Sequence, residues 1–298
     1  MLRHAEWLAS FYCYSWGWEM KPETEIVRVG DWQVYVERYI YPGVTDSVIC
    51  VNGSFSTTLA FRSCVRNFKN RVNVILFDLP FLGQSREHND LTKPLSKTDE
   101  VFILQSLINH YEPSYLLSIS WGGLAALMAL SSRPRSIRKA VVASFSTKVN
   151  DAMNYYVSQG KKLLDEGKGD EAAMLLNTEV GKYLPNLLKQ VNYEHLRQFD
   201  ESAQKQVRYH VAQITEFNQA DYIDTFRQID TPILFINGEQ DEYTTAQDIK
   251  ELSNYINNCE FITVPQAGHF IYMESRFAAD YFNDVMNGFL FVEEAMAS

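Results

Sequence analysis

Short, largely apolar runs alternate with segments of helical periodicity along most of the chain. Such runs are typical of strands buried on both faces of a parallel sheet. They lie at 47–51, 73–77, 115–119, 139–145, 233–236 and 261–264. Apolar residues recur with helical spacing in the segments between them, at 99–111, 124–130, 245–255 and 276–289. This alternation predicts an α/β fold with a mostly parallel sheet and helices on both faces.

Two further runs near the start predict an antiparallel hairpin at one edge of the sheet. Residues 27–29 and 32–39 flank the turn dipeptide Gly30-Asp31. Apolar and polar positions alternate in the second run, as expected of a strand with one face toward the core.

The pattern changes between about residues 147 and 228, where no strand is indicated. Four segments there have helical spacing: 151–165, 170–180, 187–199 and 201–217. We expect an all-helical insertion that forms a lid. The spare apolar positions of its helices either pack in a core, which is the simpler interpretation, or line a substrate pocket. The predicted divisions are therefore an N-terminal extension (1–25), the first part of the core (26–146), the lid (147–228) and the second part of the core (229–298).

The N-terminal extension is unusually aromatic. It contains Trp7, Phe11, Tyr12, Tyr14, Trp16 and Trp18. It lacks a cleavage signal, and no apolar run reaches the roughly 18 residues of a spanning helix. A packed extension is the simpler interpretation, and an anchor at a membrane surface is the alternative. We expect a cytoplasmic protein, with peripheral contact to the inner membrane as the second option.

Composition narrows the function. The 298 residues carry a net charge of -10, which argues against nucleic acid as a partner because that needs a clustered basic surface. The four cysteines are scattered without zinc-type spacing, and we expect reduced thiols. They are Cys13, Cys50, Cys64 and Cys259. No metal or cofactor site is predicted.

The most informative stretch is Ser118-Ile119-Ser120-Trp121-Gly122, where an apolar run ends at a serine and a helical segment follows. A nucleophile elbow has this form, with small residues two positions before and after the nucleophile. Serine replaces the more usual glycine at the first of these positions. By itself, the motif is equally explained by an ordinary strand-to-helix turn.

The order of other residues strengthens this interpretation. In hydrolases with such an elbow, the serine is followed by an acid and then a histidine, each after a strand. Asp241 follows the run 233–236, with Glu239 and Glu242 as rivals, and His269 follows the run 261–264. We therefore predict a catalytic triad of Ser120, Asp241 and His269.

An oxyanion hole is predicted from two backbone N–H groups. Ser54 follows the first buried run after Asn52-Gly53, and Trp121 follows the nucleophile. Both positions suit donors to a developing oxyanion. Asp78 also follows a buried run, but we expect it to shape the loop before Gly83.

Seven groups of short runs, spread over most of the chain, carry a resemblance to known proteins. They are Val51-Asn52-Gly53 with Thr57-Thr58, Phe77-Asp78-Leu79-Pro80-Phe81 with Gly83-Gln84-Ser85-Arg86 and His88-Asn89, Ser120-Trp121-Gly122-Gly123, Val180-Gly181-Lys182-Tyr183-Leu184-Pro185, Phe235-Ile236-Asn237-Gly238, Asp241-Glu242-Tyr243-Thr244-Thr245 and Gly268-His269-Phe270. These runs resemble the 3-(3-hydroxyacyloxy)alkanoate synthases of rhamnolipid biosynthesis, which are α/β-hydrolase proteins. They are also similar to the related 3-hydroxyacyl-acyl-carrier-protein:CoA transacylases.

The resemblance implies an acyl group and a partner. The substrates would be (R)-3-hydroxyacyl thioesters of acyl carrier protein or CoA. We expect a synthase, which joins two acyl groups through an acyl-serine into a 3-(3-hydroxyacyloxy)alkanoate, because the run 77–86 looks more like the synthases. The alternative is a transacylase, which the pattern His195-x4-Asp200 resembles more. That pair has a simpler interpretation as solvated side chains. A plain esterase or thioesterase and a non-catalytic binding protein are the other interpretations.

Docking of an acidic carrier protein would require a local basic surface. The candidates are Arg133, Arg135, Arg138 and Lys139, although a solvated surface is the simpler explanation for them.

Overall fold

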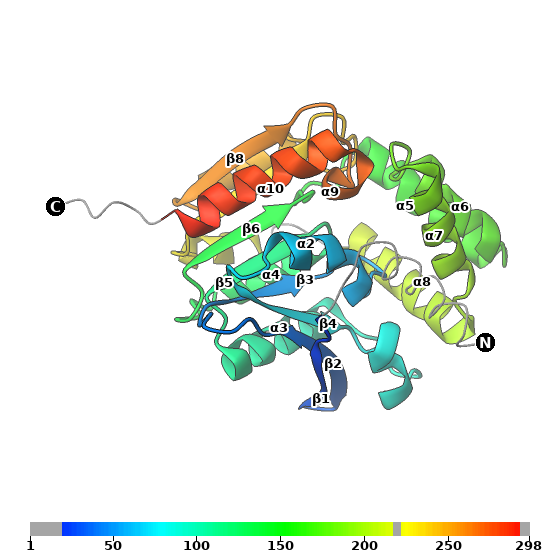
Figure 1. Ribbon diagram of the computed structural model, residues 1–298. Coiled ribbons are helices and arrows are strands. Elements are labelled where there is room, and N and C mark those ends of the chain that lie inside the picture. The colour runs from blue at the N-terminus through cyan, green and yellow to red at the C-terminus, as the bar shows by residue number, and fades with distance from the viewer. Residues whose placement is uncertain (1–19, 217–221, 293–298) are drawn as a thin grey trace.

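An eight-stranded sheet forms the centre of the protein, shown in the computed structural model of Figure 1, which describes residues 20–216 and 222–292. The strand order is β1-β2-β4-β3-β5-β6-β7-β8. β1 and β2 pair antiparallel at one edge, β2 also pairs antiparallel with β4, and the remaining pairs are parallel. The predicted edge hairpin and mostly parallel sheet are thus confirmed.

The strands follow the apolar runs closely. They are β1 (Glu23–Val29), β2 (Trp32–Tyr39), β3 (Ser47–Val51), β4 (Asn73–Asp78), β5 (Tyr115–Ile119), β6 (Lys139–Ala143), β7 (Ile233–Gly238) and β8 (Cys259–Val264). The helices around the sheet are α2 (Arg62–Asn67), α3 (Lys97–Tyr111), α4 (Gly122–Leu130), α9 (Ile271–Glu274) and α10 (Arg276–Phe291). Short 3-10 helices are η1 (Thr58–Phe61), η2 (Gly83–His88), η4 (Ile223–Gln228) and η5 (Asp248–Asn254).

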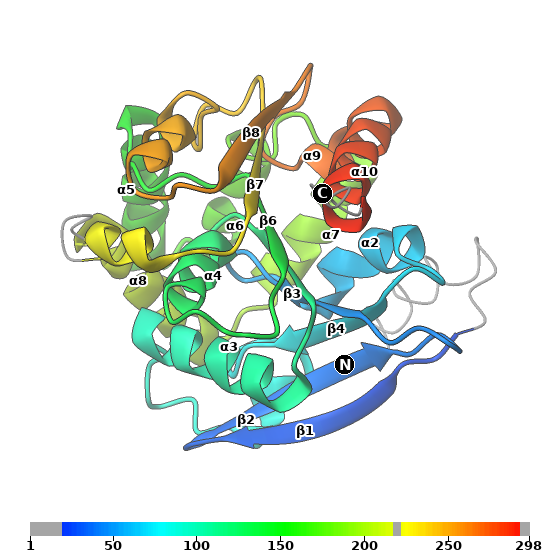
Figure 2. The ribbon, with the colours of Figure 1, turned by 90° about the vertical axis from the view of Figure 1, so that its left-hand side faces the viewer.

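Alternate residues of each central strand enter two separate cores. In β4, Val74 and Leu76 join the core beneath α2 and α10, whereas Ile75 and Phe77 join the core beneath α3 and α4. This follows from the two-residue period of a strand, which sends successive side chains to opposite faces. Figure 2 shows α3 and α4 on one side of the sheet and α2 and α10 on the other.

The helical insertion between β6 and β7 is confirmed. Its helices are α5 (Asp151–Asp165), α6 (Gly169–Thr178), α7 (Asn186–Arg197) and α8 (Glu201–Glu216), and we call residues 151–216, which span them and their connections, the lid. They gather at one end of the sheet (Figure 1). The division of the protein into four segments stays a prediction, and the aromatic residues 7–18 lie outside the described residues.

One predicted helix takes a different form. Residues 245–255 were expected to be α-helical, but the structure has the 3-10 helix η5 within this range. Its buried side chains, Ile249 and Leu252, are three positions apart. Residues at this spacing eclipse each other in a 3-10 helix, so both can face the core in a short segment.

Two phenylalanines of α10, one buried and one exposed, test how this helix stabilises the fold. Phe282 is fully buried in the core beneath α10, whereas Phe277 on the same helix is 54% exposed. We expect Phe282→Ala to lower the free energy of unfolding by about 3–5 kcal/mol, because it leaves a cavity. The matched change Phe277→Ala should alter it by about 0.5 kcal/mol or less. Urea denaturation measures both, and equal effects would contradict this packing.

Candidate active site

Ser120 occupies a sharp turn between β5 and α4. Its φ of 52° is left-handed, a strained conformation for a residue with a side chain. Its N–H donates to the carbonyl of Ala143 at 2.8 Å, which ties the turn to the end of β6. A Cβ atom at Gly122 would lie 2.4 Å from the carbonyl oxygen of Asn52, so only glycine fits there. The elbow predicted from the sequence therefore has its expected geometry.

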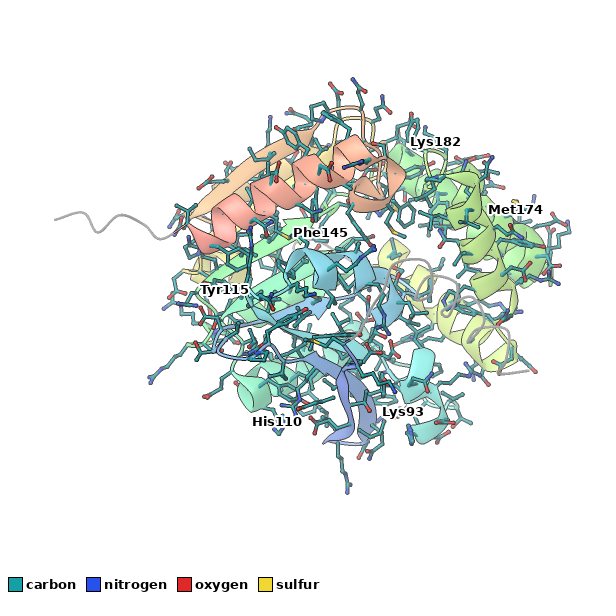
Figure 3. The ribbon with its side chains drawn as sticks, in the orientation of Figure 1. Lys93, His110, Tyr115, Phe145, Met174 and Lys182 are labelled. Atoms are coloured by element: carbon teal, nitrogen blue, oxygen red, sulfur yellow. The ribbon has the colours of Figure 1, made fainter. Side chains whose placement is uncertain are left out.

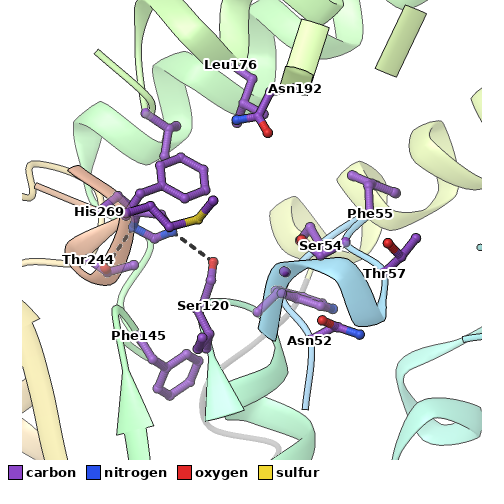
Figure 4. Close-up of a pocket in the computed structure, with 18 of the residues that line it drawn as sticks. Asn52, Ser54, Phe55, Thr57, Ser120, Phe145, Leu176, Asn192, Thr244 and His269 are labelled. Carbon is purple, nitrogen blue, oxygen red and sulfur yellow. Dashed lines mark hydrogen bonds between the residues drawn. The ribbon is translucent and has the colours of Figure 1, made fainter. Parts of the chain in front are cut away.

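Ser120, His269 and Asp241 are brought into one hydrogen-bonded series. His269 Nε2 lies 2.9 Å from Ser120 Oγ, and His269 Nδ1 lies 2.8 Å from Asp241 Oδ2. An ionised carboxylate can only accept, so Nδ1 carries the proton and Nε2 is left to accept the proton of the serine hydroxyl. Figure 4 shows the bond between Ser120 and His269 at the floor of a pocket. The rivals Glu239 and Glu242 bond elsewhere, to Gln266 and to Lys182.

Asp241 is buried but remains a strong acceptor. Its Oδ1 accepts from the N–H groups of Tyr243 and Thr244 at 2.9 and 3.1 Å, and its Oδ2 accepts from the Thr244 hydroxyl at 2.5 Å. Burial alone would raise the pKa of Asp241, but His269 and the bonds from Thr244 outweigh it and lower that pKa below its ordinary value. The carboxylate is therefore ionised at neutral pH.

The loop that carries His269 is fixed by two residues that the sequence did not single out. Glu274, which is buried in α9, accepts from the N–H of Gly268 at 2.6 Å and from that of Phe270 at 2.9 Å. The Ser144 hydroxyl donates to the carbonyl of His269 at 2.6 Å. The residues on both sides of the histidine are thus held. No periodicity or motif signals such contacts in a sequence.

The loop with Ser54 passes directly beside the nucleophile. A Cβ atom at Gly53 would lie 3.1 Å from the Cβ of Ser120 and 3.3 Å from the carbonyl oxygen of Ile119. Ser54 therefore follows a residue in contact with the elbow, and Trp121 is the next residue after Ser120. Figure 4 shows Ser54 and Phe55 across the pocket from His269. Both predicted oxyanion donors belong to segments that border Ser120.

Asp78 joins two loops behind this site. Its carboxylate accepts from the N–H groups of Thr58 and Gln84 at 2.8 and 2.9 Å. Gly83 has a φ of 47°, and a Cβ atom there would overlap the Asp78 carboxylate. Burial raises the pKa of Asp78 to about 6 despite these bonds. Asp78 thus has the predicted place before Gly83, where it shapes the loop.

An apolar cavity of about 660 Å³ opens above Ser120. This volume lies within the range of about 300–1,000 Å³ that is usual for small-molecule sites. The lid contributes an apolar wall of Met153, Tyr156, Val157, Leu176, Val180, Leu188, Val191 and Leu196. Helix α7 has no buried residue. The expectation that spare apolar positions of the lid are core is therefore wrong for Leu188, Val191 and Leu196 of α7, which line the cavity.

The lid also contacts the acid and histidine loops. The Tyr243 hydroxyl donates to Glu179 at 2.9 Å, and Lys182 pairs with Glu242 at 2.8 Å. Tyr183 packs so closely on Gly268 that a Cβ atom there would lie 2.6 Å from its ring. The sequence runs 180–185 and 241–245 are thus two sides of one contact between lid and core.

Comparison with known proteins identifies the family of this protein. A family model described as the alpha/beta hydrolase fold matches residues 46–275. The (R)-3-hydroxydecanoyl-ACP:CoA transacylase of Pseudomonas putida is 38% identical over 272 residues, which cover 91% of this protein and 92% of the relative. The protein of the same name from Pseudomonas aeruginosa is also 38% identical, and the match covers 91% of each. The chain belongs to the α/β-hydrolase superfamily and to the family of these transacylases.

Solved α/β-hydrolase structures share the fold. An α/β-hydrolase enzyme from a Medee basin deep-sea metagenome library superposes with a TM-score of 0.74 at 20% identity, covering 91% of this protein and 98% of the other. An esterase from Exiguobacterium antarcticum gives a TM-score of 0.74 at 14% identity, covering 91% and 100%. At these identities the likeness concerns the fold alone.

The basic residues suggested for carrier docking lie away from the pocket. Lys139 is the first residue of β6 and pairs in register with Tyr115, the first residue of β5, whereas Ser120 follows the other end of that strand. Figure 3 shows Tyr115 at the end of the sheet opposite the lid residues Met174 and Lys182. Three of the four are also engaged. Arg138 pairs with Asp46, Arg133 with Asp230, and Lys139 binds two carbonyls at the end of α10.

Disulfides, metal clusters and membrane-spanning helices are absent from the described residues. Cys50, Cys64 and Cys259 are free thiols, and burial raises the pKa of Cys64 to about 12. In the described ranges no cluster of His, Cys, Asp and Glu could hold a metal ion. No helix within these ranges is long and apolar enough to cross a membrane.

The lowered pKa of Asp241 predicts how stability depends on pH. Because the folded pKa lies below the ordinary 3.8, the ionised group stabilises the fold above about pH 4, and this is lost as pH falls through the folded value. Asp241→Asn has no charge to lose. The difference in unfolding free energy between wild type and this variant, measured by urea denaturation, should therefore shrink from neutral to acidic pH. A constant difference would contradict the assignment.

Proposed function

We propose that this protein is an acyltransferase that moves (R)-3-hydroxyacyl groups from the thioester of acyl carrier protein to CoA, with Ser120 as the nucleophile. The observation that carries the proposal is a serine bonded to a histidine–carboxylate pair at the floor of a large apolar cavity. A fatty acyl group suits such a cavity. The names of the relatives that share 37–38% identity supply the acyl group and the acceptor.

The chemistry follows from the hydrogen-bonded series. His269 takes the proton of Ser120 as Oγ attacks the thioester carbonyl, and the N–H groups of Ser54 and Trp121 stabilise the oxyanion. The carbon–sulfur bond then breaks, and the carrier thiol leaves with the proton from His269. The acceptor thiol of CoA next gives its proton to His269 and attacks the acyl-serine. Ser120 leaves and regains the proton.

A second acceptor is favoured by the size of the cavity. Its volume of about 660 Å³ lies well inside the range of about 300–1,000 Å³ that is usual for small-molecule sites, and its lid wall is apolar. Such a cavity suits a second acyl group as the acceptor. The second candidate function is therefore the synthase reaction, in which the 3-hydroxyl of another acyl group attacks the acyl-serine and gives a 3-(3-hydroxyacyloxy)alkanoate. Such a product is the lipid precursor of rhamnolipid-type biosurfactants.

Product analysis separates these functions. Purified protein is supplied with (R)-3-hydroxydecanoyl carrier protein with and without CoA, and the products are identified by mass spectrometry. We expect 3-hydroxydecanoyl-CoA, formed only when CoA is present. A dimeric hydroxyacyloxyalkanoate without CoA would favour the synthase, and free 3-hydroxy acid alone in both reactions would identify a thioesterase.

Replacement of the nucleophile tests the acyl-serine. Ser120→Ala should lower kcat by about a million-fold, since the attacking oxygen is lost. Intact-protein mass spectrometry should detect an acyl adduct on wild type and none on this variant. Ser118→Ala is the matched control, because the buried Ser118 hydroxyl has no hydrogen-bond partner among the described residues. An adduct that survives Ser120→Ala would overturn the mechanism.

The carrier protein should approach at the mouth of the cavity. Arg62 and Arg66 of α2 line the cavity, and Lys69 and Arg71 follow nearby in the sequence. Arg66, Lys69 and Arg71 are exposed and make no ion pair with any described residue. These three cations suit the acidic surface of a carrier protein.

A charge reversal tests this docking surface. The double variant Arg66→Glu/Lys69→Glu should raise KM for the carrier thioester at least about 10-fold at low salt, because unpaired cations steer acidic partners. KM for a short thioester without the carrier protein should stay near the wild-type value. Arg133→Glu/Arg135→Glu, which changes the same charge at the opposite end of the sheet, is the control. Equal effects of the two double variants would refute docking at α2.

A further inference from the structure

The turn that follows Ser54 is strained. Phe55 has a φ of 57°, in the left-handed region that bulky side chains rarely adopt. Such a conformation persists only where neighbouring groups hold it. Since Ser54 directly precedes it, contacts that hold Phe55 also limit how far the Ser54 backbone can move.

Two lid histidines hold this turn. His210 of α8 is buried, and its Nε2 lies 2.8 Å from the Ser54 hydroxyl. His195 of α7 donates from Nε2 to the carbonyl oxygen of Phe55 at 2.9 Å. The Phe55 ring packs edge-on against His210, with 4.8 Å between centroids. Both residues of the turn are thus bonded to the lid.

His210 also contacts the second oxyanion segment. Its ring lies edge-on to the Trp121 indole, with 4.5 Å between centroids. One side chain of the lid therefore touches both Ser54 and Trp121, the two residues whose N–H groups the proposed mechanism uses.

Helix α8 is also bonded to the core on the same face that carries His210. Gln206, His210 and Gln213 are spaced as i, i+4 and i+7 and so lie on one helix face. Gln206 bonds to both the N–H and the carbonyl of Leu95, at 3.0 and 2.9 Å, and Gln213 accepts from the N–H of Lys97 at 2.8 Å. These bonds fix α8 to the start of α3.

The His195-x4-Asp200 motif acquires a role in the same contact. Asp200 accepts from the N–H of Ala203 at 3.0 Å at the start of α8, and it pairs with Arg86 of η2. The two residues of the motif thus bind different parts of the core. Both side chains are exposed, as expected of solvated residues, and each also bonds to the core.

We propose that His210 and His195 are positioning residues of the oxyanion hole, which is complete only when α7 and α8 are docked on the core. Docking of the lid then places the N–H groups of Ser54 and Trp121 for catalysis and at the same time closes the cavity over the acyl group. This rests on the proposed attack by Ser120 but not on the identity of the acyl group or acceptor. The H-x4-D motif acts as a clamp between lid and core.

Two ketone inhibitors of equal length test the proposal. An alkyl trifluoromethyl ketone adds to an active serine as a tetrahedral oxyanion, whereas the matching methyl ketone binds without an adduct. His210→Ala should weaken inhibition by the trifluoromethyl ketone about 10-fold or more, since a misplaced donor stabilises the oxyanion poorly. Binding of the methyl ketone should change little, and His210→Gln should recover part of the loss.

Controls separate positioning from general damage. Tyr209→Ala removes an exposed ring from the same helix and should leave both inhibitors unaffected. His195→Ala should selectively weaken the trifluoromethyl ketone, whereas His195→Gln retains a donor for the Phe55 carbonyl and should recover part of that loss. Equal weakening of both ketones by His210→Ala, or no weakening, overturns the proposal. Because both probes are simple ketones, failure of hydroxyacyl transfer alone would leave this result intact.

Discussion

The site depends on how closely the ends of two neighbouring parallel strands, β3 and β5, approach each other. The loop after β3 touches the elbow after β5 so tightly that Gly122 has no room for a Cβ atom and Gly53 has little. This contact places the Ser54 segment beside Ser120 and holds the serine in its left-handed conformation. The glycines thus provide space for a backbone contact, and the strain at Ser120 is sustained by the sheet on either side.

The remaining polar groups of the site are fixed before any substrate arrives. The Asp241 carboxylate is saturated by Thr244 and its neighbours, and Glu274 holds both sides of His269. Groups held in this way need little reorganisation as charge develops, which is the main source of electrostatic catalysis. Burial would otherwise favour a neutral carboxyl, so these hydrogen bonds keep the acid ionised.

The lid joins the two sides of this arrangement. Glu179 and Lys182 reach the acid loop, and His195 and His210 reach the oxyanion turn. Between these contacts, apolar side chains of α5, α6 and α7 form the wall of the cavity. In the proposed mechanism, a lid bonded to both the Asp241 loop and the Ser54 turn would exclude water from the acyl-serine, a condition that transfer requires and hydrolysis does not.

The strands, the helical insertion and the order of Ser120, Asp241 and His269 could be predicted from the sequence, because they depend on local periodicity and on where polar residues follow apolar runs. It failed where the outcome depends on contacts between distant segments. The segment 245–255 contains a 3-10 helix, the apolar side of α7 lines a cavity, and Glu274 and His210 gave no signal. A local pattern reports which face of an element is apolar but not what that face meets. What each face meets depends on how the lid packs on the sheet, and this packing joins segments that are far apart in the sequence.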